Sequence, residues 1–153
     1  ALGTSSVTEE DVRAIVGDVS ADTLEETIDA AASGEVRRLP HLIDRLVSAG
    51  TATFQLHQQL LRYFQQLQTM REMVEKGGEP VGRVVERRRP HFRRKHAMEV
   101  ALSAWPLDAI TMILQRIDAD ILASRKEGGL ALTITRQTLL DVAVEAARLR
   151  TRH

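Results

Sequence analysis

Apolar residues recur along this chain at intervals of three and four positions, which is the spacing of one face of an α-helix. Two such series are longer than the others. The first consists of Leu56, Leu60, Tyr63, Leu67, Met70 and Val74, and the second of Leu107, Ile110, Leu114, Ile117 and Ile121. Alternation of apolar and polar residues, the pattern of a half-buried strand, is nearly absent. The pattern therefore predicts helices that pack along apolar seams, and the two long seams should supply most of the core.

Glycine and proline residues divide this helical pattern into seven or eight segments. Helices are predicted near residues 8–16, 23–33, 36–49, 53–76, 80–89, 92–104, 107–127 and 135–150. Gly17, Gly34 and Gly50 follow the first three segments, in the position where helices commonly end. Pro40 lacks a backbone donor and should kink the third helix or delay its start, and the residue before Pro90 should end the fifth. No internal repeat is visible, so we predict an all-α protein folded as a compact multi-helix bundle.

The composition is that of a folded protein, with 43% apolar and 27% charged residues. The absence of cysteine excludes disulfides, thiolate metal sites and cysteine nucleophiles. No apolar run reaches the roughly 18 residues of a membrane span, and no signal-peptide pattern is visible. The chain begins Ala1-Leu2-Gly3 without a methionine, as expected of a piece of a longer protein. We expect a cytoplasmic location and no membrane partner.

The positive charge of the chain is concentrated between Arg83 and His96. This window holds seven basic residues and one acid, a net charge of +6, and because the whole chain has 21 charges of each sign, the remainder carries −6. Clustered arginines beside an aromatic ring are typical of contacts with a phosphate backbone. The candidate DNA-binding residues are Arg87, Arg88, Arg89, His91, Phe92, Arg93, Arg94 and Lys95. The alternative is a solvated segment whose arginines pair with acids elsewhere in the chain or on a neighbouring subunit.

Other chemical motifs are missing from the sequence. The Gly-Gly pairs at 77–78 and 128–129 lack the residues of a phosphate-binding loop and are interpreted as turns between helices. The five histidines lack the spacing of metal ligands. Acids at 9–11 are interpreted as a charged helix start, and Asp118 and Asp120 as a solvated helix face. We therefore predict no catalytic, cofactor-binding or metal-binding residue, no cofactor, and no enzymatic activity such as ATP hydrolysis in this chain.

His57 lies beside the longer seam in the company of six glutamines. These are Gln55, Gln58, Gln59, Gln65, Gln66 and Gln68. This polar side should be solvated, and the alternative is that it hydrogen-bonds a neighbouring subunit.

Six segments carry a resemblance when they are taken in order. Residues 7–18 form a short helix with an acidic start, residues 24–34 and 39–50 form a helical pair, and the long glutamine-rich helix follows. Residues 80–95 read Pro-Val-Gly-Arg-Val-Val-Glu-Arg-Arg-Arg-Pro-His-Phe-Arg-Arg-Lys, a short helix and a basic loop that carries an aromatic residue. Residues 101–126 contain Ala-Leu-Ser-Ala-Trp-Pro-Leu and a long helix ending at a lysine. By their order and spacing, these segments resemble the C-terminal region of the delta subunit of the bacterial DNA polymerase III clamp loader.

The resemblance implies a domain organisation and a structural role. Residues 1–19 would be the tail of a preceding AAA+ lid domain, and residues 20–153 would form a helical collar, or oligomerisation, domain. Collar domains pack side by side to assemble the loader, and the delta subunit helps to open the sliding clamp and load it on primed DNA during replication. The implied partners are gamma/tau-type and delta-prime-type subunits through the collar, the sliding clamp through an N-terminal domain outside this chain, and primed DNA. The parent protein would belong to a DNA-directed DNA polymerase holoenzyme, a nucleotidyltransferase, without a catalytic site in this part.

A second interpretation is a stand-alone helical nucleic-acid-binding or adaptor domain that uses residues 83–95. The two interpretations differ in what the isolated chain should do. A collar domain should associate with other loader subunits through helix faces. An autonomous DNA-binding protein should bind duplex tightly by itself, with an affinity that falls steeply with salt.

Overall fold

The computed structural model describes residues 9–152, and the side chains from residue 21 onward. This part of the chain is an all-α compact bundle of seven α-helices without strands, which confirms the predicted fold class. The elements are α2 (Glu9–Ser33), α3 (Leu39–Ser48), α4 (Thr53–Glu75), α5 (Val81–Arg87), α6 (Phe92–Ala104), α7 (Leu107–Lys126), the 3₁₀ turn η1 (Gly128–Leu130) and α8 (Ala131–Thr151).

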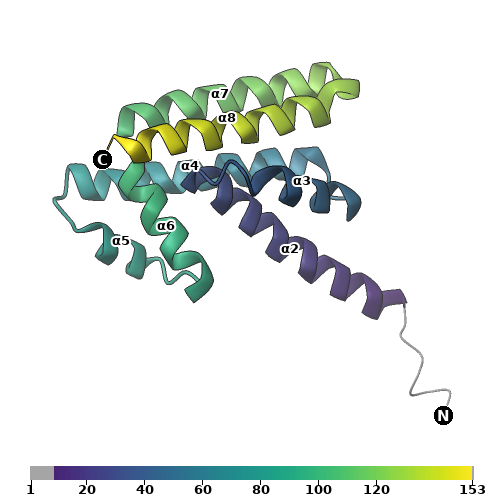
Figure 1. Cartoon of the computed structure of the whole chain (residues 1–153), viewed down its shortest axis with the longest axis horizontal. Coiled ribbons are helices and arrows are strands. Elements are labelled where there is room, and N and C mark those ends of the chain that lie inside the picture. The colour runs from purple at the N-terminus through teal and green to yellow at the C-terminus, as the bar shows by residue number, and fades with distance from the viewer. Residues whose placement is uncertain (1–8, 153) are drawn as a thin grey trace, which may run out of the picture.

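Helices α4, α7 and α8 pack against one another, and the other helices pack around them. Helices α7 and α8 lie side by side, and α4 packs against α7 (Figure 1). Helices α5 and α6 form a pair at the end of the bundle to which α4 leads (Figure 1). Helix α2 packs against α3, α6 and α8, and its N-terminal end extends away from the other helices (Figure 1).

Helix α2 joins two segments that the sequence pattern separates. It runs without a break from Glu9 to Ser33, so the predicted helix end at Gly17 is wrong. A glycine inside a helix costs only about 1 kcal/mol relative to alanine, which a helix continuing into a packed segment can tolerate. The predicted capping residue Thr8 lies outside the described residues. The predicted domain boundary after residue 19 depends on how the first residues pack, and their side chains are also outside the described part, so it stays a prediction.

The other local signals for helix ends are confirmed. Gly34 and Gly50 follow α2 and α3 with positive φ angles of 84° and 82°, a conformation that glycine adopts readily. Pro40 occupies the first turn of α3, so this helix starts late, as one of the two predicted outcomes requires. The predicted limits of α4, α5, α6 and α7 agree with the structure within two residues, whereas α8 begins at Ala131, earlier than expected.

Most residues of the two predicted seams are buried in the core. Five of the six seam residues of α4 are buried, and Val74 is half-buried. On α7, Ile110, Ile117 and Ile121 are buried, but Leu107 and Leu114 are only half-buried. Helix α7 is covered mainly by α4 and α8, so only a narrow face of it is enclosed and residues at the edge of its stripe remain partly exposed.

Trp105 lies at the centre of the core, in the turn between α6 and α7. Its ring meets that of Phe64 edge to face, with centroids 4.9 Å apart, and Phe64 meets Tyr63 in the same way at 5.6 Å. The indole Nε1 donates a hydrogen bond to the carbonyl oxygen of Ala32 at 2.9 Å. Trp105 therefore links the α6–α7 turn to both α4 and α2.

Candidate nucleic-acid interface

The basic segment forms a sharp corner between α5 and α6. Helix α5 ends at Arg87 and α6 begins at Phe92, which confirms the predicted break before Pro90. Arg89 has a φ angle of +49°, in the left-handed region that residues other than glycine rarely occupy. A following proline also disfavours the right-handed helical conformation at this residue. The chain therefore reverses within a few residues and places the basic side chains outside the packed core.

The first turn of α6 presents an exposed aromatic ring. Phe92 is 76% exposed, and its ring centroid lies 4.5 Å from that of His91. The guanidinium carbon of Arg93 lies 5.7 Å from the Phe92 centroid. His91 is the N-cap of α6, because its Nδ1 accepts a hydrogen bond from the backbone N–H of Arg93 at 3.2 Å. This cap fixes the backbone on which Phe92 and Arg93 stand.

Three of the predicted DNA-binding residues are engaged in ion pairs within the chain. Arg87 pairs with Glu79, and Lys95 lies 3.4 Å from Glu86. Arg94 is the most enclosed of the three. Its Nε and Nη2 donate to the two carboxylate oxygens of Asp29 at 2.9 and 3.0 Å, and its Nη1 lies 3.6 Å from Glu25. The predicted alternative, in which the arginines pair with acids elsewhere in the chain, therefore describes part of the cluster.

The remaining arginines of the cluster are exposed. Arg88, Arg89 and Arg93 have no ion pair within residues 21–152, and the same is true of Arg83. The structure thus divides the cluster into free cations at the corner and paired cations at its edges. Because Arg87, Arg94 and Lys95 are paired with acids, the repulsion within the basic segment is smaller than its net charge of +6 suggests.

The surroundings of Glu79, Asp29 and Tyr63 shift the pKa values of these three groups. The hydrogen bond from Arg87 lowers the pKa of Glu79, whose side chain is half-buried. Burial raises the pKa of Asp29, and the hydrogen bond and charge of Arg94 oppose this effect. The Tyr63 hydroxyl is buried without a hydrogen-bond partner within the described residues, and burial raises its pKa above the usual range. The two-oxygen contact from Arg94 fits an ionised Asp29 carboxylate.

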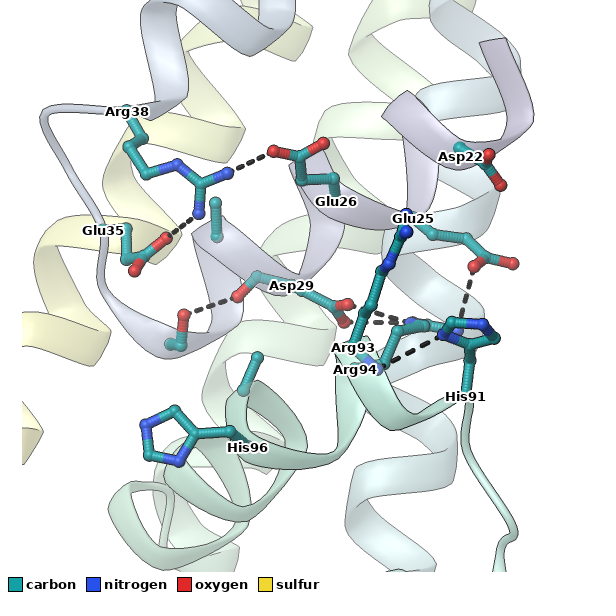
Figure 2. Close-up of a pocket in the computed structure, with 13 residues that line it drawn as sticks. Asp22, Glu25, Glu26, Asp29, Glu35, Arg38, His91, Arg93, Arg94 and His96 are labelled. Carbon is teal, nitrogen blue, oxygen red and sulfur yellow. Dashed lines mark hydrogen bonds and ion pairs between the residues drawn. The ribbon is translucent and has the colours of Figure 1, made fainter. Parts of the chain in front are cut away.

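A groove of about 580 Å³ lies between α2 and the first half of α6 (Figure 2). One wall carries the acids of α2, namely Asp22, Glu25, Glu26 and Asp29. The other wall carries Arg93, Arg94 and His96 of α6, together with its N-cap His91. Arg38 bonds both Glu26 and Glu35 at the end of the groove (Figure 2). The sequence pattern does not predict this groove, because its two walls are more than 60 residues apart along the chain.

His57 is buried rather than solvated, so the prediction for this residue is wrong. It is only 2% exposed, and Nδ1 and Nε2 lie 3.1 and 3.4 Å from the hydroxyls of Thr135 and Thr138 on α8. Thr138 also donates to the carboxylate of Asp120 at 2.8 Å. His57 therefore uses both ring nitrogens inside the chain. Asp120 belongs to the same network instead of a solvated face, whereas Asp118 is exposed as predicted.

We expect the His57 network to lose stability as the pH falls below about 6.5. Burial lowers the pKa of His57, and the charge of Asp120 opposes this effect only in part. The unfolded state then binds more protons than the folded state in this range, so the free energy of unfolding should decrease on acidification. Urea unfolding measured between about pH 7.5 and 5 should show this decrease, and His57→Gln should flatten it.

His41→Gln is the matched control for this experiment, because His41 is exposed on α3. It should leave the pH dependence of the wild-type protein unchanged. The raised pKa of Asp29 acts in the opposite sense, since a carboxyl that binds its proton more readily when folded loses stability as the pH rises. This effect is common to all three proteins. Parallel curves for His57→Gln and the wild type would contradict the prediction.

Within the described residues, no group of three or more His, Cys, Asp or Glu side chains is placed to hold a metal ion. None of the described helices is by itself long and apolar enough to cross a membrane, although α6 and α7, bent by 106° at their junction, pass the length and composition criteria as a pair. Comparison with protein-family models, with curated proteins and with solved structures gave no match.

Proposed function

We propose that this chain is a collar-type assembly module of a delta-type clamp-loader subunit, and that its α5–α6 corner contacts single-stranded DNA next to the primed site. The observation that carries the DNA contact is the exposed corner itself, where Phe92 stands beside the free cations Arg88, Arg89 and Arg93. The assembly role rests on the order of the helical segments and on their resemblance to the delta family. In this proposal the chain has no catalytic role and acts by joining gamma/tau-type and delta-prime-type subunits in the cytoplasm.

The corner offers two kinds of contact to a single strand. Free guanidinium groups attract phosphates and release counterions, which provides affinity with little sequence preference. An exposed ring can stack on a base, and such stacking is worth about 1–3 kcal/mol per base. Because α6 is capped by His91, the ring and the Arg93 side chain stand on an ordered turn. This arrangement favours an unpaired strand over duplex, in which the bases are already stacked.

Replacing both Arg88 and Arg93 with alanine should weaken binding to a single-stranded oligonucleotide and flatten its salt dependence. Each lost phosphate contact should reduce the slope of log K against log salt by about 0.7 for single strands. Phe92→Ala should weaken binding by about 1–3 kcal/mol and leave the slope nearly unchanged, because it removes stacking without removing charge. Fluorescence anisotropy at several salt concentrations measures both quantities.

The matched control is Arg37→Ala with Arg45→Ala. These arginines are also exposed and without ion pairs within the described residues, so the double variant loses the same charge at another place. It should lower affinity less than the corner variant and leave stacking unaffected. If the corner variant binds DNA normally but no longer co-purifies with the loader subunits, the corner is a protein interface and the proposed DNA contact is wrong.

A stand-alone nucleic-acid-binding or adaptor domain is the second candidate, and the free arginines of the corner favour it equally. The two functions differ in assembly. Sedimentation of the chain mixed with gamma/tau-type and delta-prime-type subunits should show a complex if the collar proposal is right. Tight duplex binding by the chain alone, with a steep salt slope and no complex with those subunits, would favour the stand-alone domain.

A further inference from the structure

Arg94 belongs to the basic motif, but its side chain has a different environment from those of its neighbours. The free arginines of the corner are exposed, whereas the Arg94 side chain is enclosed between α6 and α2 (Figure 2). Its guanidinium contacts both carboxylate oxygens of Asp29, whose side chain is only 10% exposed. Such a two-oxygen contact fixes the orientation of the guanidinium as well as its distance.

Arg94 also stands in the turn that carries the candidate DNA contacts. Its backbone N–H donates to the carbonyl of His91 at 2.8 Å, and the N–H of Arg93 donates to the His91 ring. The residues 91–94 therefore form one hydrogen-bonded unit. A side chain that anchors Arg94 to α2 also fixes the direction in which Phe92 and Arg93 project.

We infer that Arg94 is a positioning residue, and that its ion pair with Asp29 holds the first turn of α6 in the orientation that binds the single strand. This inference rests on the proposed function of the corner. In this arrangement Arg94 contacts no phosphate. It increases the affinity for the strand only by holding Phe92 and Arg93 in the orientation that binds. The acids of α2 beside Arg94 also make the groove unfavourable for a polyanion, so the strand approaches from the side of Arg88 and Arg89.

Asp29→Asn separates a positioning role from a phosphate contact, because the two roles predict opposite changes. The substitution removes a negative charge and leaves Arg94 without its buried counterion. If Arg94 binds phosphate, freeing it should tighten binding to the oligonucleotide. If Arg94 positions the turn, binding should weaken by about tenfold even though the protein has become more positive, because the binding groups lose their fixed geometry.

Glu26→Gln is the matched control for this substitution. It makes the same change of charge on the same wall of the groove, but Glu26 bonds Arg38 and not α6. Its affinity for the oligonucleotide should equal or slightly exceed that of the wild type. The inference would be wrong if Asp29→Asn bound the oligonucleotide as tightly as Glu26→Gln, or more tightly.

Arg94→Lys is a second variant that tests the same point if Asp29→Asn does not fold. Lysine keeps the charge but cannot contact both carboxylate oxygens in the fork geometry of arginine. A positioning role predicts weaker binding with an unchanged salt slope, whereas Arg93→Ala should reduce the slope by about 0.7. Unchanged affinity in Arg94→Lys, or a slope reduced as in Arg93→Ala, would show that residue 94 acts as a charge on the strand.

Backbone hydrogen exchange distinguishes failure of this inference from failure of the proposed function. The amides of residues 93–97 should exchange faster in Asp29→Asn and Arg94→Lys than in Glu26→Gln, whether or not DNA is present. If the wild-type chain binds no oligonucleotide, the proposed DNA contact fails, and exchange alone decides whether the ion pair orders the turn. If exchange in these variants equals that of the wild type, the positioning role is wrong even where the chain binds DNA.

Discussion

Replacing Trp105 with alanine should lower the free energy of unfolding by about 3–5 kcal/mol, the range observed when large buried aromatic residues are truncated. The side chain is fully buried and packs against Phe64. Its removal leaves a cavity between α4, α6 and α2, and the carbonyl of Ala32 loses a buried hydrogen bond. Urea unfolding followed by far-ultraviolet circular dichroism should record the loss, since the protein has no other tryptophan to report by fluorescence.

Two variants separate the contributions to this effect. Trp105→Phe keeps a buried ring but leaves the Ala32 carbonyl unbonded, and should cost about 1–3 kcal/mol. Met112→Ala removes a side chain that is 71% exposed and should change stability by less than about 0.5 kcal/mol. A Trp105→Ala protein as stable as Met112→Ala would show that the core is not centred on this residue.

Gly34→Ala should be the most damaging change at any glycine with a positive φ angle in the described chain. An added Cβ would lie 2.7 Å from the backbone nitrogen of Ala147 and 2.9 Å from its Cα, so α2 and α8 must separate. The left-handed conformation costs about 1–2 kcal/mol, and overpacking a close contact costs about 1–3 kcal/mol more. The movement should also strain the nearby hydrogen bond from Arg150 to the carbonyl of Ser33, at 2.8 Å. Thermal and urea unfolding should show a loss of about 2–5 kcal/mol.

Gly50→Ala provides the matched control, because Gly50 has nearly the same φ angle but no atom within 4 Å of the added Cβ. This variant should lose only the conformational cost of about 1–2 kcal/mol. The difference between the two variants then measures the close approach of α2 to α8. Equal losses in both would mean that the contact at Ala147 yields without cost.

Local chemistry made most helix ends predictable from the sequence. Pro40 and Pro90 act through their own backbone geometry, and so do Gly34 and Gly50 with their positive φ angles. Gly17 shows the limit of this reasoning. A glycine fits a helix end and also tolerates a helix interior, and the choice depends on the helical segment that follows rather than on the glycine itself.

Burial of polar residues depended on partners that are distant in the sequence. His57 precedes Leu60 by three positions and Phe64 by seven, so the helical spacing places it on the apolar face, whereas the glutamines beside it are typical of a solvated face. The threonines whose hydroxyls contact the His57 ring lie on α8, 78 and 81 residues away. The spacing suggests burial, but only the packing of α8 against α4 supplies the partners.

The charge count predicted a basic cluster but not its division into free and paired cations. Asp29 lies in a predicted helix next to Ile28, and nothing in the local pattern connects it with Arg94, 65 residues further along the chain. The sequence also does not predict that Leu114 is only half-buried, because its position in the seam is the same as that of buried residues. Its exposure depends on how far α4 and α8 extend around α7. Tertiary packing decides these cases.

The continuity of α2 has a mechanical consequence. Its packed half provides the nucleus that an isolated helix of this size lacks, so the half that leaves the bundle continues by propagation alone. At 1.5 Å per residue, the segment 9–20 forms a lever of about 18 Å, and a rotation of the bundle by about 10° displaces Glu9 by about 3 Å. Gly17 lies within this lever, and a glycine inside a helix weakens it by about 1 kcal/mol relative to alanine. The stiffness of α2 around Gly17 therefore determines how much of any movement of the bundle reaches the N-terminal end of the helix.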